Sequence, residues 1–142
     1  MAKNKTAEAP TAEGSFDFDI NLNDVPESIL LEDGEYTMRI DKIEKKTSKS
    51  SDYEYFNAIL QSTEEPTADS VYFMIGIPIP SDDEKKSLNK KRGLKKFLDA
   101  AQVDYSSGSF NINDAVGQEI TVLLKQEEHE GRLSNKVVRL VG

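Results

Sequence analysis

The segments Tyr53–Leu60 (YEYFNAIL) and Val71–Ile77 (VYFMIGI) both alternate as half-buried β-strands do. In each segment one parity is apolar and predicts a row of core residues. These rows are Phe56, Ala58 and Leu60 in the first segment and Val71, Phe73, Ile75 and Ile77 in the second. The opposite parity places the rings of Tyr55 and Tyr72 at the surface. The sequence therefore predicts two adjacent strands with aromatic side chains on their outer face.

Composition limits the class of protein. A chain of 142 residues with 37% hydrophobic residues and a mean hydropathy of -0.58 predicts one domain with a modest core. The chain has no cysteine, which excludes disulfides and thiolate metal sites. The first residues have no apolar stretch typical of a secretion signal, and no apolar run approaches the length of a membrane span. We therefore expect a cytoplasmic protein that does not associate with a membrane.

The net charge of -8 is unevenly distributed along the chain. Residues 1–35 hold two lysines and nine acidic residues, a net charge of -7, which leaves -1 for residues 36–142. A nearly neutral domain with clustered lysines can bind phosphate whatever its overall charge. The simpler interpretation of the acidic segment is that it keeps a small protein dispersed.

Three regions follow from the pattern. Residues 1–15 lack periodicity and are predicted to be a disordered tail. Residues 16–33 form an acidic arm, in which FDFDINLN (Phe16–Asn23) alternates and predicts an extra strand. Residues 34–142 form the main domain.

The main domain begins with a strand at Gly34, in which Ile43 breaks the inward parity and predicts a β-bulge. A helix is predicted after Ser81, which with Glu84 has the form of a capping box, and a break or bend is predicted near Gly93. A short helical turn over 112–117, a strand with Ile120, Val122 and Leu124, a turn at Glu130–Gly131 and a last strand over 136–141 complete the order.

Three strands, a helix and a hairpin are the order of the OB-fold. We therefore predict a mainly β, five-stranded Greek-key barrel with one helix between strands 3 and 4 and an acidic N-terminal arm. Such barrels bind ligands on the face of strands 2 and 3, between the two loops that here span 45–52 and 126–135.

The predicted binding residues are aromatic and basic. A base stacked on a tyrosine contributes about 1–3 kcal/mol, although tyrosines also favour strands for packing reasons. The stacking candidates are Tyr53, Tyr55 and Tyr72. The phosphate-binding candidates, which have a solvated surface as their alternative, are Arg39, Lys45, Lys46, Lys49, Lys125, Arg132, Lys136 and Arg139. Together they predict a sequence-tolerant binder of single strands.

The densest charge lies between Lys85 and Lys96, where seven residues are basic. Such a run on a helix is usually a solvated face, and we favour that interpretation over guidance of nucleic acid.

Several short motifs occur in an order that resembles a known family. They are FDFD (16–19), DGEY (33–36), KKTSK (45–49), RGLKKFLDAA (92–101) and AVGQEI (115–120). The chain resembles small phage proteins, encoded in replication or recombination cassettes, that bind single-stranded DNA through an OB-fold. The resemblance implies a non-enzymatic role on single strands in phage DNA metabolism, in the host cytoplasm. Many single-strand binders end in an acidic tail, whereas this chain ends in RLVG (139–142).

Catalysis has little support in the sequence. The single histidine, His129, falls in a predicted turn, and neither a P-loop nor a glycine-rich dinucleotide motif is present. We expect no enzyme activity, no cofactor and no metal site. Two other functions remain open: an interaction module whose arm (16–22) contacts replication or recombination proteins, and a structural virion or assembly component. The sequence does not specify an oligomeric state.

Overall fold

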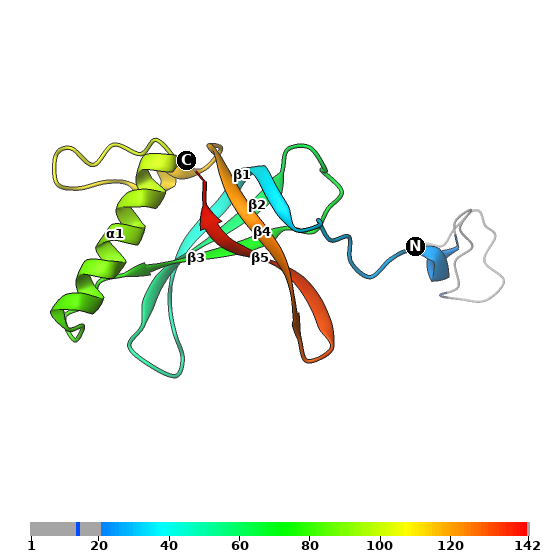
Figure 1. Cartoon of the computed structure of the whole chain (residues 1–142), viewed down its shortest axis with the longest axis horizontal. Helices are drawn as coiled ribbons and strands as arrows, with labels where there is room; N and C mark the ends of the chain where they lie inside the picture. The colour runs from blue at the N-terminus through cyan, green and yellow to red at the C-terminus, as the bar shows by residue number, and fades with distance from the viewer. Residues whose placement is uncertain (1–13, 15–20, 142) are drawn as a thin grey trace.

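The computed structural model of the chain describes Gly14 and residues 21–141. This part is mainly β, with five strands and one α-helix (Figure 1). The elements are η1 (Leu22–Asp24), β1 (Gly34–Thr47), β2 (Glu54–Ser62), β3 (Val71–Ile77), α1 (Glu84–Ala100), η2 (Ile112–Ala115), β4 (Glu119–His129) and β5 (Arg132–Leu140), where η marks a 3₁₀ turn. The predicted order of strands and helix is therefore confirmed.

The strands form one antiparallel sheet in the order β3-β2-β1-β4-β5. The central strand β1 pairs with β4 along its first half and with β2 along its second half. The two edge strands, β3 and β5, contact each other, so the sheet curls toward a barrel. Helix α1 packs against both of these strands.

The predicted β-bulge is present in β1. Its register against β2 shifts between Ile40 and Lys42, so that Asp41 is the extra residue. Ile40 and Ile43 are both buried, as the break in parity predicted. Because a bulge bends its strand, β1 can leave the plane it shares with β4 and pair with β2.

The predicted core rows are confirmed. Phe56, Ala58 and Leu60 of β2 and Val71 and Ile75 of β3 are buried, and Phe73 and Ile77 pack against the same core. The ring of Phe73 lies 6.1 Å from that of Phe97, which α1 contributes. The helix therefore covers the end of the core near β3.

Two predictions about the helix are wrong. The helix runs through Gly93 without a break, and Leu88 is left 45% exposed. The second half of the helix, with Leu94, Phe97, Leu98 and Ala100, holds it on the core, so Leu88 does not have to be buried. The N-cap is Asp83 and not Ser81: the Asp83 carboxylate accepts a hydrogen bond from the backbone N–H of Lys86 at 2.7 Å.

The predicted turn at Glu130–Gly131 is confirmed. Both residues have positive φ, 53° and 80°, as a tight two-residue hairpin turn requires. Strand β5 begins at Arg132, four residues earlier than predicted, and lengthens the hairpin. Figure 1 shows this hairpin and the β1–β2 hairpin extending from the sheet on the same side.

The extra strand predicted around residues 16–23 lies largely outside the described residues. In its described part, the Asn21 side chain accepts a hydrogen bond from Asn23 N–H and caps η1, so residues 21–23 are not a strand.

The segment just before β1 belongs to the core. Leu31 is only 5% exposed. Its carbonyl oxygen accepts hydrogen bonds from the side chains of Gln126 (2.9 Å) and Asn135 (2.7 Å), and its N–H donates to Asn135 Oδ1 at 2.9 Å. The β4–β5 hairpin therefore clamps the chain at this point.

We predict that Leu31→Ala lowers the free energy of unfolding by about 2–5 kcal/mol, because it leaves a cavity in the core. Ile29→Ala is the matched control, since Ile29 is 41% exposed. We expect this control to stay within about 0.5 kcal/mol of the parent. Urea titration measures both, and equal losses would show that Leu31 does not belong to the core.

Candidate nucleic-acid interface

The outer face of β1, β2 and β3 collects the side chains that alternate away from the core. We call this surface the β1–β3 face. Its cross-strand rows are Lys46–Tyr55–Gly76, Glu44–Asn57–Met74, Lys42–Ile59–Tyr72 and Arg39–Gln61. Several residues of the predicted site therefore share one surface.

The centre of the β1–β3 face is apolar and accessible. Tyr72 is 61% exposed and Met74 is 56% exposed, although both are large hydrophobic side chains. Tyr55 and Ile59, on the neighbouring strand, are half-buried. Such a flat, exposed band of rings and aliphatic chains is suited to stacking with planar groups.

Cations lie at both ends of this band. Arg39 is at one end and Lys46 at the other. The Arg39 guanidinium donates a hydrogen bond to Asp41 at 2.6 Å, and this contact raises the pKa of Arg39 above its ordinary value. Lys42 forms an ion pair with Glu44 at 3.5 Å. The carboxylates of Asp41 and Glu44 therefore orient Arg39 and Lys42 and offset part of their positive charge.

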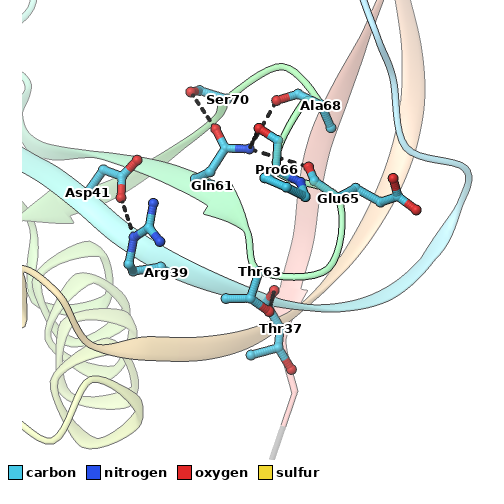
Figure 2. A network of polar contacts seen from close by, with 9 residues as sticks. All are labelled: Thr37, Arg39, Asp41, Gln61, Thr63, Glu65, Pro66, Ala68 and Ser70. Atoms are coloured by element: carbon cyan, nitrogen blue, oxygen red, sulfur yellow. Dashed lines mark hydrogen bonds and ion pairs between the residues drawn. The ribbon is translucent and has the colours of Figure 1, made fainter.

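Gln61 fixes the loop that leads into β3 (Figure 2). Its amide nitrogen donates to the carbonyl oxygens of Pro66 (3.2 Å) and Ala68 (3.0 Å), and its amide oxygen accepts from Ser70 at 3.3 Å. Figure 2 shows Arg39 on the neighbouring strand beside Gln61. The loop is thereby held up to Ser70, which directly precedes β3 and lies two residues before Tyr72.

Tyr53 connects the β1–β2 loop to α1. Its ring stacks on that of Tyr55, with centroids 5.6 Å apart and planes at 26°. The Lys90 ammonium of α1 lies 4.8 Å from the centroid of Tyr53. The Tyr53 hydroxyl lies over Gly76, where a Cβ would be only 3.0 Å from it. Glycine at position 76 thus allows the ring to lie against the sheet.

Lys90 is held by Asp82. Its ammonium lies 2.9 Å from Asp82 Oδ2, and the two side chains are 10% and 2% exposed. The backbone N–H of Ile79 donates to the same carboxylate at 3.0 Å. This hydrogen bond, followed by the contact with Lys90, lowers the pKa of Asp82. A fixed cation therefore stands beside the Tyr53 ring.

Lys136 borders the β1–β3 face across the edge of the sheet. It lines, with Tyr72 and Leu133, a groove of about 390 Å³ between β3 and β5. Lys125 on β4 is the cross-strand partner of Lys136. The Lys136 ammonium forms an ion pair with Glu127 at 3.2 Å. The groove brings one more predicted cation close to an exposed ring.

The other predicted residues lie elsewhere. Lys45 points to the opposite face from Lys46 and pairs with Glu54 at 3.1 Å. Lys49 is exposed in the β1–β2 loop, and Arg139 is exposed on β5 opposite Leu123.

Arg132 stands at the tip of the β4–β5 hairpin. It lines a separate groove of about 760 Å³ together with Glu27, Asp69 and His129. Three of the residues that line this groove, Glu27, Asp69 and Glu130, are acidic, so it is less suited to phosphate than the β1–β3 face.

Sequence reasoning missed Met74, Ile59, Lys42 and Lys90. Met74 follows from parity because it lies two positions after Tyr72 in β3. Ile59 follows because it lies four positions after Tyr55 in β2, and even spacings in a strand share a face. The position of Lys90 against Tyr53 depends on how α1 docks, which no local pattern in the sequence encodes.

No model of a known protein family matches the chain, and no curated protein matches it either. Among residues 21–141, no three His, Cys, Asp or Glu side chains gather as a metal site would require. None of the helices in the described part of the chain combines the length and the apolar character needed to cross a membrane.

We predict that Asp82 contributes stability only when ionised. Because its pKa is lower in the folded state, this contribution is fully present above the unfolded value of about 4 and is lost as the pH falls through the folded value. The difference in unfolding free energy between the parent protein and Asp82→Asn should therefore shrink from pH 7 to pH 3. Denaturant titrations at both pH values measure it, and a constant difference would contradict the assignment.

Proposed function

We propose that this chain binds single-stranded DNA without strong sequence preference and protects it during phage DNA replication or recombination. The role is non-enzymatic and is exercised in the host cytoplasm. The observation that carries the proposal is the β1–β3 face, where exposed Tyr72 and Met74 lie between Arg39 and Lys46. The order of the short motifs that resemble the phage family supports the same function.

We assign the barrel to the OB-fold. Three features support the assignment: the sheet order β3-β2-β1-β4-β5 with contacting edges, the bulge in β1, and the helix between β3 and β4. In this fold, strands 2 and 3 and the two flanking hairpin loops bind oligonucleotides. The β1–β3 face occupies that position here.

Base stacking and phosphate neutralisation each contribute to the binding free energy. Bases stack on Tyr55 and Tyr72, with Ile59 and Met74 filling the space between the rings. Arg39, Lys46 and Lys136 neutralise phosphates along the two borders of the face. Stacking accepts every base because each has a π-face, and the phosphate term makes the affinity depend on salt.

We predict that Tyr55→Ala combined with Tyr72→Ala weakens binding to oligo-dT by roughly 30-fold to 10⁴-fold, because two lost stacks cost about 2–6 kcal/mol together. Fluorescence polarisation at low salt measures the affinity, and circular dichroism checks that the fold is kept. Val138→Ala, an exposed apolar position on β5, is the control for surface truncation. Unchanged affinity in the double variant would remove the stacking role.

Lys45 and Lys46 provide a test of the electrostatic part, since they are adjacent in sequence but lie on opposite faces. We predict that Lys46→Gln weakens binding and lowers the slope of log K against log salt by about 0.7, the share of one phosphate contact. Lys45→Gln should leave both the affinity and the salt slope nearly unchanged. The assignment of the face fails if Lys45→Gln has the larger effect.

A further inference from the structure

Gly93 occupies an exposed position in the middle of α1. A Cβ added there would meet no atom of residues 21–141 within 4 Å, and the backbone does not have the positive φ that favours glycine. Neither packing nor backbone geometry therefore requires glycine. Because glycine is the poorest helix former apart from proline, the helix is less stable with it than with almost any other residue.

Most helix neighbours of this exposed position are polar or basic. Residues three, four and seven positions apart share a helix face. By this spacing, the neighbours of Gly93 are Lys86, Asn89 and Lys90 before it and Lys96, Phe97 and Ala100 after it, of which Phe97 and Ala100 pack on the core. Lys90 is held by Asp82, whereas Lys86 and Lys96 form no ion pair within residues 21–141.

Several charges on this helix lower its stability, although Lys95 pairs with Asp99 at 3.5 Å. Lys85 and Lys86 lie in the first turn, where the helix dipole favours acidic residues. Lys86 and Lys90 are like charges four residues apart, a destabilising spacing. The cations and the glycine therefore both lower the stability of α1, and a bound anion would offset the cost of the charges.

This helix surface is continuous with the β1–β3 face. Tyr53 contacts Tyr55 of the sheet on one side and Lys90 of the helix on the other, at the Gly76 end of β3. A strand lying along Tyr72, Met74 and Tyr55 would meet the helix at this point.

We infer that α1 carries a second stretch of the nucleic-acid path, in which the phosphodiester backbone lies against Gly93. The absence of a side chain there lets the phosphates approach the helix closely, and Lys86 and Lys96 neutralise them. This inference rests on the proposed function and adds to it a track beyond the aromatic face. It also explains why a helix of this charge keeps a glycine at its exposed centre.

The test compares Gly93→Gln, Lys86→Gln with Lys96→Gln, and the control Lys91→Gln. Lys91 lies about 160° around the helix from Gly93 and forms no ion pair within residues 21–141. Binding is measured with oligo-dT of about 6 and about 18 nucleotides, since one such barrel covers roughly 4–16 nucleotides. Thermal unfolding is followed for each variant.

We expect Gly93→Gln to raise Tm and yet weaken binding of the long oligonucleotide several-fold, while binding of the short one is kept. The double lysine variant should lower the salt slope for the long oligonucleotide by about 1.4. Lys91→Gln should bind both lengths as the parent does.

Two results would overturn the inference. If Gly93→Gln and the lysine variant bind the long oligonucleotide as the parent does, the helix track is wrong, while the proposed function stands as long as the parent binds both lengths. If the parent itself binds neither oligonucleotide, the proposed function fails and the helix track fails with it.

Discussion

The extra residue Asp41 in β1 is the constraint from which the rest of the architecture follows. By bending the strand, it lets β1 pair with β4 over Gly34–Arg39 and with β2 from Met38 onward, on both sides of the bulge. The sheet can then curl until β3 approaches β5. The bulge also changes which parity faces outward. Before it, Arg39 is on the outer face; after it, Lys42 and Lys46 are. One insertion thus determines both the curvature of the sheet and the cations that border its candidate binding face.

The positions of the aromatic side chains in that face depend on two contacts near the C-terminal end of β3. Gly76 leaves room for the Tyr53 hydroxyl, and Asp82 holds Lys90 against the Tyr53 ring. Tyr53 then supports Tyr55 by stacking. The face is therefore positioned by contacts from β2, β3 and α1 together. Within residues 21–141, the exposed residues Tyr72 and Met74 have no comparable cover.

Much of this fold could be predicted from the sequence because strand alternation is a local signal. The inward rows of β2 and β3, the bulge near Ile43 and the turn at Glu130–Gly131 are all visible in the order of residues. Lys45 and Lys46 point in opposite directions because they are neighbours in a strand, and the bulge determines that Lys46 is the one on the outer face. The first residue of the helix was harder to predict, because Ser81, Asp82 and Asp83 are all residue types that favour the N-cap. Tertiary contacts determine which of them occupies that position. The burial of Leu31 depends on Gln126 and Asn135, roughly a hundred residues away, and no local pattern encodes it.

The central claim is that a single strand lies across the β1–β3 face. The most direct measurement is an NMR titration of the isotopically labelled protein with oligo-dT, following the backbone amides residue by residue. The account predicts that the largest saturable shifts occur at Tyr55, Asn57, Tyr72 and Met74. Shifts confined to the groove around His129 and Arg132, with those four amides unmoved, would contradict it.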